Sequence, residues 1–350
     1  MACDYRHTPG VRDTEGMVDV TVIGAGPVGL ACAIEAQRVG LSARIIEKQA
    51  LVNSIVGYPN GMEFFSTPDL IEIGGYPFPV QGYKPTREEA IEYYRGVTAR
   101  ENLDVRQYER VTDLRGAVGA FEVVTDKAVH ASSHVVVSTG FFDLPNLLNV
   151  LGEELPKVTH YYREPYPYFR QKVAVIGAKN SAAKAALDLY RHGADVTLLV
   201  RGPVLSDTIK YWIRPDLENR IKEGSITARF DTTVEEIRET SLLLVTPQGA
   251  DEITNDFVLA MTGYQPDFSF LERLGITFAD DGWRTPIYDE ATFESARPGL
   301  HVAGTVCGGM KTNRWFIENG RFHARQIAQH IAGRRADPIP FAEMHWKTAE

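Results

Sequence analysis

The chain has 350 residues, of which 44% are hydrophobic and 24% are charged, with a formal net charge of −9. These values suit a globular protein of two or more domains, and the absence of Lys or Arg runs argues against nucleic-acid and anionic-membrane partners. No apolar stretch is long enough to span a bilayer, and none resembles a signal peptide. Three cysteines without a CxxC pair predict a reducing compartment, so we expect a cytoplasmic protein. Residues 1–16 are polar and aperiodic, which predicts a disordered extension.

The first predicted unit reads VTVIGAGPVGLACAIEAQRVGLSARIIEK, which is a strand, a glycine turn, a helix and a second strand. Gly24, Gly26 and Gly29 form a GxGxxG fingerprint. In this fingerprint the glycines allow a tight turn, close approach of a pyrophosphate and packing of helix on strand. Glu47 ends the second strand, where a carboxylate accepts hydrogen bonds from an adenosine ribose. This unit therefore predicts a dinucleotide site.

A second copy of the unit follows 153 residues later, in KVAVIGAKNSAAKAALDLYRHGADVTLLVR. Gly177 keeps the place of the first glycine, whereas Lys179 and Ala182 replace the second and third. Repetition of a whole strand–helix–strand unit without a gap indicates a duplication. The sequence thus predicts two related nucleotide-binding domains.

The second copy differs from the first at the end of its second strand. Val200 stands in the place of Glu47, and Arg201 follows it. Loss of the acid and gain of a guanidinium suit a 2′-phosphate, which a carboxylate would repel and an arginine binds bidentately. The alternative is that Arg201 is a solvated residue at a strand end and that the repeat is a structural relic. Further positive charge and hydrogen-bond donors are expected from Asn180, Ser181, Lys210 and Arg214.

Two strand-like runs end in Thr-Gly, at Thr139–Gly140 and Thr262–Gly263, and each precedes a loop that contains proline. We expect the chain to cross between domains at these points. A final strand runs through Gly304 into a long helix, which is expected to complete the first site. The predicted fold is α/β, with two Rossmann-like domains and the second inserted into the first. The first site has Glu47 and the longer surrounding segment, so it is expected to hold FAD, and the second to hold NADPH. The expected ranges are 17–155 and 264–335 for the FAD domain, 156–263 for the NADPH domain and 336–350 for a C-terminal tail.

Beyond both turns, several long strings carry a resemblance: LVNSIVGYPNGMEFFST, IGGYPFP, THYYREP, IKYWIRPDLENRIKEGSI and TNRWFIENGR. From about Met17 to Gly333 the chain resembles thioredoxin-reductase-like flavoproteins, and within them the bacillithiol-disulfide-reductase family. The resemblance implies FAD, NADPH and an assembly larger than a monomer. It also implies that the loop after residue 52 lies beside the flavin and that the Thr312–Asn313 segment closes over it.

Two departures from related enzymes bear on the chemistry. Thioredoxin reductases carry a CxxC before the second nucleotide motif, where this chain reads HYYREPYPYF, so a dithiol relay from this domain is excluded. Many bacillithiol-disulfide reductases have a cysteine in the first turn, where this chain has Val28. Cys307 is the better placed of the remaining thiols and is the candidate catalytic residue, although a structural role is the alternative. Cys32 is expected to be a packing residue. The nine histidines show no metal spacing, so no metal is predicted.

These features predict a FAD enzyme that takes hydride from NADPH and reduces a low-molecular-weight disulfide of the bacillithiol type. The partner is then a small-molecule disulfide or a small redox protein. The alternatives are a ferredoxin- or flavodoxin-NADP reductase and a slow redox sensor that binds both cofactors. The residues predicted to contact FAD are Gly24, Gly26, Pro27, Val28, Gly29, Glu47, Lys48, Asn53, Ser54, Phe64, Ser66, Val111, Thr139, Gly140, Gly304, Thr312 and Asn313, and those predicted to contact NADPH are Gly177, Lys179, Asn180, Ser181, Ala182, Arg201, Lys210, Arg214, Thr262 and Gly263.

Overall fold

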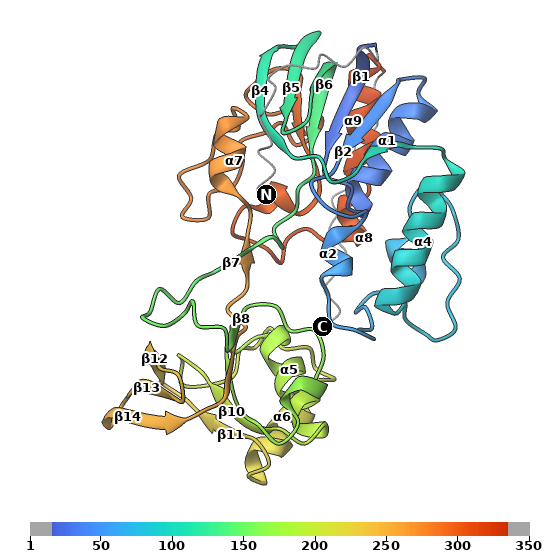
Figure 1. The fold of residues 1–350 in the computed structure, drawn as a ribbon. Helices are drawn as coiled ribbons and strands as arrows, with labels where there is room; N and C mark the ends of the chain where they lie inside the picture. The colour runs from blue at the N-terminus through green and yellow to red at the C-terminus, as the bar shows by residue number, and fades with distance from the viewer. Residues whose placement is uncertain (1–15, 335–350) are drawn as a thin grey trace, which may run out of the picture. The chain divides into compact units, whose positions relative to one another are not determined.

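The computed structural model describes residues 16–334, which form two units (Figure 1). The first unit contains the chain up to Val56, Gly61–Leu144 and the chain from Gln265 onward. The second unit contains Gly57–Asn60 and Pro145–Tyr264. Most of the predicted N-terminal extension, and the predicted C-terminal tail, lie outside the described residues.

The first unit is built on a seven-stranded sheet. Strand β1 (Val18–Ile23) pairs in parallel with β2 (Ala43–Ile46) and with β6 (Val129–Val137). Strand β6 is long enough to take two partners on its other edge, first the antiparallel β5 and then the parallel β17. The remaining strands of the sheet are β3 (Asp104–Arg106), β4 (Val111–Ala117), β5 (Ala120–Thr125) and β17 (Leu300–Val302). The parallel strands place the glycine turn at the carboxyl end of β1, where α/β sheets bind ligands.

Helix α1 (Pro27–Arg38) is buried along most of its length. Small residues such as Gly29, Ala33 and Ala36 let it lie close to the sheet and to α9 (His323–Ile331). Helix α4 (Arg87–Arg100) begins at a capping box, in which the Thr86 side chain accepts from the Glu89 N–H and the Glu89 carboxylate accepts from the Thr86 N–H. The other helices of this unit are α2 (Asn53–Val56), α3 (Pro68–Ile71), α7 (Phe268–Arg273), the 3₁₀ helix η2 (Gly304–Gly308) and α8 (Ile317–Gly320).

The second unit has a five-stranded parallel sheet in the order β11-β10-β9-β15-β8. Helix α5 (Asn180–Arg191) packs its alanines on one face of the sheet, and the antiparallel β12–β13 pair covers residues of the other face. Side chains alternate between the faces along each strand: Val173 and Val175 face α5, whereas Ala174 faces the antiparallel strands. The elements of this unit are β8 (Val158–Thr159), η1 (Tyr166–Tyr168), β9 (Lys172–Ile176), β10 (Asp195–Leu199), α6 (Arg214–Lys222), β11 (Thr227–Arg229), β12 (Thr233–Ile237), β13 (Ser241–Thr246), β14 (Gly249–Thr254) and β15 (Phe257–Ala260).

The repeat found in the sequence corresponds to matching elements in the fold. Helices α1 and α5 each have 12 residues, and their first residues, Pro27 and Asn180, are separated by the same 153-residue offset as the two turns. Both turns also begin with a glycine at positive φ, +106° at Gly24 and +145° at Gly177. The prediction of two Rossmann-like domains, with the second inserted into the first, is confirmed.

The chain crosses between the units at β7 (Leu144–Pro145) and β16 (Tyr264–Gln265), which pair with each other. The first crossing lies at residue 145 rather than at the expected 156. Residues 145–155 belong to the second unit because Leu148 and Leu155 pack on its core and the Leu151 carbonyl accepts the Ile237 N–H.

Tyr264 also falls in the second unit, whereas residue 264 was expected to open the returning part of the first. Its hydroxyl donates to the His160 carbonyl, and its ring stacks on Tyr161 at 5.3 Å. The third difference is that Gly57–Asn60, expected in the first domain, belongs to the second unit. The Asn60 N–H donates to the Arg163 carbonyl of that unit. These contacts join residues far apart in the sequence, which local sequence patterns do not reveal.

Candidate active site

The glycine turn of the first unit has the shape that a pyrophosphate requires. A Cβ at Gly24 would lie 2.8 Å from the Ser138 carbonyl oxygen, and a Cβ at Gly29 would lie 2.0 Å from the Gly24 carbonyl oxygen. At Gly26, by contrast, a Cβ would meet nothing within 4 Å. Gly26 is the N-cap of α1, has no side-chain cap and is followed by a first turn without acidic residues. The N-terminus of α1 is therefore an open, positively polarised cradle that fits a diphosphate.

Glu47 lies beside this cradle, directly after β2. Its carboxylate is buried, and it accepts hydrogen bonds from the Ala25 N–H (2.8 Å) and the Gln49 N–H (2.9 Å). Burial raises the pKa of Glu47, and these two hydrogen bonds oppose that rise. A carboxylate has about four acceptor positions, so a ribose can still bind to it. The neighbouring Lys48 forms an ion pair with Asp143 at 2.6 Å.

Val28, which replaces the family cysteine, is held between two glycines of the returning segment. A Cβ at Gly304 would lie 3.2 Å from the Val28 side chain, and a Cβ at Gly320 would lie 3.3 Å from it. The Gly304 N–H donates to His323 Nδ1 at 3.1 Å. The first turn therefore meets η2 and α8 through the branched side chain of Val28, which fills this space without a thiol.

The loop after residue 52 is tied to the same region. The Val52 N–H donates to the Ala25 carbonyl at 3.1 Å, next to the glycine turn. The Asn53 amide donates to Gln49, and the Ser66 hydroxyl donates to Glu318 of α8. The loop is thus fixed between the glycine turn and α8. The other residues expected near FAD are dispersed in their exposure: Phe64 and Val111 are buried, Ser54, Thr139, Gly140 and Thr312 are half-buried, and Asn313 is exposed.

The second turn repeats the backbone of the first with different side chains. A Cβ at Gly177 would lie 2.6 Å from the Met261 carbonyl oxygen, so only glycine fits at this position. Ala182 is buried at the position of the third glycine, so helix α5 accommodates one methyl group there. Lys179 is the N-cap of α5, in an extended conformation and without a side-chain cap. Beyond it, the Thr262 hydroxyl donates to the Asn146 carbonyl at 2.5 Å, next to Gly263.

Some polar side chains around the second turn form hydrogen bonds within the protein. Asn180 donates to the Thr208 carbonyl and accepts from the Lys210 N–H, both at 2.9 Å. The Arg214 guanidinium binds the Leu205 and Ser206 carbonyls and two carboxylates. These two side chains hold the loop over residues 205–210, through contacts that sequence spacing does not indicate. Lys210 Nζ lies 5.7 Å from the Trp212 ring.

Arg201 and Ser181 are exposed polar residues near this turn, as is Lys179 within it. Arg201 directly follows Val200 at the end of β10, and within residues 16–334 its guanidinium makes no hydrogen bond or ion pair. Ser181 is exposed in the first turn of α5. An unpaired guanidinium at this position is free to bind a 2′-phosphate.

The cysteines are placed against a catalytic role. Cys307 is 0% exposed, and burial raises the pKa of its thiol well above the ordinary value. Its Sγ lies 3.9 Å from His323 Nδ1. Cys32 is also buried, and burial raises its pKa to about 12. Reactive cysteines are exposed and of low pKa, so the structure does not support Cys307 as the catalytic residue. Cys307 was favoured because Gly304, Gly308 and Gly309 lie near it in the sequence. Nearby glycines do not show whether a thiol lines a site or is buried beneath it.

No helix in the described part of the chain is long and apolar enough to cross a membrane.

Two dinucleotide-binding domains, one inserted into the other, are typical of oxidoreductases that bind both a flavin and a nicotinamide nucleotide. Residues 21–304 match the model of the pyridine nucleotide-disulphide oxidoreductase family, and the chain belongs to that family. It is 42% identical to "Bacilliredoxin reductase Bdr" of Bacillus subtilis (strain 168) over 317 residues, which cover 89% of this chain and 97% of the relative. Membership makes the chain an oxidoreductase enzyme, and it confirms FAD and NADPH as the predicted cofactors.

Solved structures agree with this assignment. The fold matches "Bacillithiol Disulfide Reductase Bdr (YpdA)" from Staphylococcus aureus with a TM-score of 0.88 and 39% identity, over 91% of this chain and 99% of that one. It also matches the thioredoxin reductase of T. acidophilum with a TM-score of 0.71 and 20% identity, over 90% of this chain and 98% of that one. The second match shows the fold alone, and it confirms the expected thioredoxin-reductase-like architecture.

Proposed function

We propose that this chain is a FAD-dependent reductase that takes two electrons from NADPH and delivers them to a low-molecular-weight disulfide of the bacillithiol type. The observation that carries the proposal is the duplicated unit, with buried Glu47 beside the first turn and unpaired Arg201 beside the second. The likeness to a bacilliredoxin reductase supports the disulfide as acceptor. In the overall reaction NADPH, a proton and a disulfide give NADP⁺ and two thiols, and the S–S bond breaks as it receives the electron pair.

FAD is assigned to the first unit. The open N-terminus of α1 at Gly26 binds the diphosphate, and Glu47 orients the adenosine ribose. FAD, when bound, supplies the capacity to accept hydride and pass on both electrons. The loop at Asn53 and Ser66 and the Thr312–Asn313 segment enclose the flavin and exclude water from it. Val28 fills the gap between Gly304 and Gly320.

NADPH is assigned to the second unit. The N-terminus of α5 binds the diphosphate, and Arg201 binds the 2′-phosphate that distinguishes NADPH from NADH. Lys179 adds positive charge at the N-cap. Asn180 and Arg214 act indirectly, because they hold the loop that follows Arg201.

The acceptor disulfide is reduced without a mixed disulfide to either cysteine of the described residues. Cys32 and Cys307 are both buried and hold their protons at neutral pH, so neither offers a thiolate to an incoming disulfide. The residue at the family's cysteine position is Val28. We further infer a cytoplasmic homo-oligomer; light scattering of the purified protein tests its oligomeric state.

A screen of electron acceptors tests the proposal. The holoprotein is mixed with NADPH under anaerobic conditions, and loss of absorbance at 340 nm is followed with bacillithiol disulfide, with bacillithiol-modified bacilliredoxin, with flavodoxin and with ferredoxin. We expect rapid turnover with a bacillithiol disulfide. Rapid turnover with flavodoxin or ferredoxin alone contradicts the proposal and identifies a ferredoxin/flavodoxin-NADP reductase. Slow oxidation with every acceptor identifies a redox sensor instead.

A further inference from the structure

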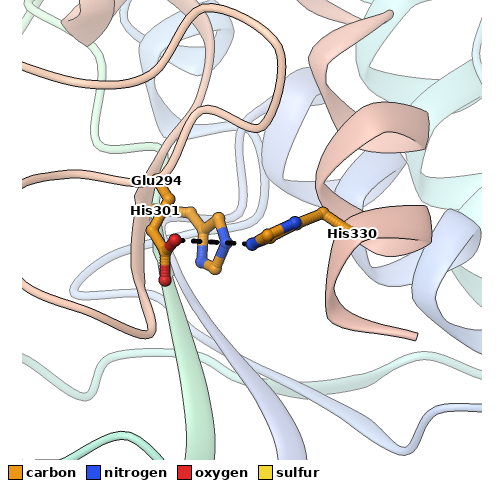
Figure 2. Close-up of side chains that lie close together, drawn as sticks. All are labelled: Glu294, His301 and His330. Carbon is orange, nitrogen blue, oxygen red and sulfur yellow. Dashed lines mark ion pairs between the residues drawn. The ribbon is translucent and has the colours of Figure 1, made fainter. Parts of the chain in front are cut away.

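Three metal-ligating side chains converge in the first unit, in a place that no step of the proposed reaction uses. Glu294 lies before β17, His301 lies in the middle of β17, and His330 lies in the last turn of α9. One ligand atom from each residue lies within 4.8 Å of the other two. Figure 2 shows the three side chains close together, with a dashed line for the ion pair between Glu294 and His330.

His301 is the residue that makes this cluster unusual. The side chain is 0% exposed, and neither ring nitrogen has a hydrogen-bond partner among the described residues. Buried polar atoms in folded proteins are almost always paired, and an unpaired buried imidazole is unfavourable. The Val135 backbone lies near the ring, at a geometry that falls short of a hydrogen bond.

The three side chains are also chemically suited to a metal ion. Two imidazoles and one carboxylate are ligand types that divalent transition metals bind.

A simple ion pair does not account for the arrangement. Glu294 Oε2 and His330 Nε2 lie 3.4 Å apart, which satisfies those two groups and leaves His301 unpaired behind them. Tetrahedral zinc at about 2.0–2.1 Å from each ligand separates ligand atoms by about 3.3 Å. The Glu294 and His330 atoms, 3.4 Å apart, already have this separation. The His301 nitrogen needs to move toward them by no more than about 1.5 Å.

We infer that Glu294, His301 and His330 bind one divalent transition-metal ion, Zn²⁺ by the chemistry of the ligands. Two imidazoles and one carboxylate leave a fourth position for water on the exposed side, where the Glu294 and His330 side chains are 30% and 38% exposed. The ion fastens the last turn of α9 to β17, the edge strand beside β6. This link between two elements predicts that the bound ion stabilises the fold. Spacing in the sequence does not reveal the site, because its ligands come from three separate segments.

The test is zinc binding by the holoenzyme, with a matched control. Metal-free holoenzyme is titrated with Zn²⁺ against a chromogenic chelator, in the wild type and in the variants Glu294→Gln, His330→Gln and His301→Gln. The control is His192→Gln in the second unit, because His192 also pairs with a carboxylate, Asp188, at 3.2 Å and is likewise 38% exposed. The exposed Glu294 and His330 keep the test decisive if the buried His301→Gln variant fails to fold.

We expect one Zn²⁺ per wild-type or His192→Gln chain and an affinity lowered more than about tenfold in Glu294→Gln and His330→Gln, since even loss of an outer-sphere partner has an effect of that size. The melting temperature of the wild type should rise by about 5 °C with saturating Zn²⁺, and that of His330→Gln should not. A zinc X-ray absorption spectrum should contain two imidazole ligands. Unchanged zinc affinity in Glu294→Gln and His330→Gln, or no uptake by the wild type, overturns the inference.

Discussion

Two glycines three residues apart in the first turn have different structural environments, so we expect replacing each with alanine to have different consequences. At Gly29 an added Cβ lies 2.0 Å from the Gly24 carbonyl oxygen and 2.6 Å from Ser138 Oγ. The backbone must move by about 1 Å to relieve such a contact, which costs more than the roughly 3 kcal/mol of ordinary overpacking. Gly29→Ala should therefore strongly destabilise the protein, with or without FAD.

At Gly26 an added Cβ meets no protein atom within 4 Å, and the backbone there is extended at φ −72° and ψ 172°. Alanine adopts this conformation freely, so Gly26→Ala should change the stability of the apoprotein by less than about 1 kcal/mol. Its methyl group instead occupies the space assigned to the diphosphate. Loss of one charge-assisted hydrogen bond is worth about 1.5–3 kcal/mol, so the FAD dissociation constant should rise about 10- to 150-fold.

The assay combines two measurements on each variant. Urea unfolding of the apoprotein, followed by circular dichroism, gives the free energy of unfolding, and titration with FAD, followed by flavin fluorescence, gives the affinity. Gly96→Ala is the control, because Gly96 lies in open space on α4 and should change FAD binding in neither direction. The reasoning is refuted if Gly26→Ala is as unstable as Gly29→Ala, or if it binds FAD as tightly as the wild type.

Three further substitutions test individual residues. Arg201→Ala should raise the KM for NADPH about 10- to 150-fold by loss of a charge-assisted contact and leave the KM for NADH unchanged; equal effects, or the same effect in the control Arg191→Ala, contradict the 2′-phosphate assignment. Cys307→Ala should retain disulfide turnover, since the thiol is buried, and loss of turnover with unchanged NADPH-dependent dye reduction shows that the sulfur reacts. Glu47→Gln should lower the free energy of unfolding of the apoprotein by about 1–3 kcal/mol, because an amide cannot accept from both of its backbone donors; an unchanged urea midpoint contradicts this.

The sequence was sufficient to predict those features that depend on residues close together in the chain. Strand ends, glycine turns and helix starts depend on residues within a few positions of one another, so the 153-residue offset placed α5 at Asn180–Arg191. Alignment of the two copies also showed that the second strand of the first copy ends at the acidic Glu47, whereas that of the second copy ends near the cationic Arg201. These features predicted the fold and the nucleotide pair.

The sequence was insufficient where contacts are long-range. Asn180 was expected to donate to a phosphate and Arg214 to add positive charge, but sequence spacing did not show that both side chains hold the loop between them. Residues 145–155 looked like a continuation of the first domain, yet their apolar side chains pack on the second. The cluster at Glu294, His301 and His330 exists only after β17 and α9 have packed.

The most direct test of the account is an anaerobic titration of the purified holoprotein with NADPH. We predict a yellow protein with one FAD per chain, whose absorbance near 450 nm bleaches with about one equivalent of NADPH and far less readily with NADH. The reason is that Arg201, which has no ion-pair partner among residues 16–334, can bind the 2′-phosphate. A protein that carries no flavin and cannot be reconstituted with it, or a bound flavin that NADPH leaves oxidised, contradicts the account.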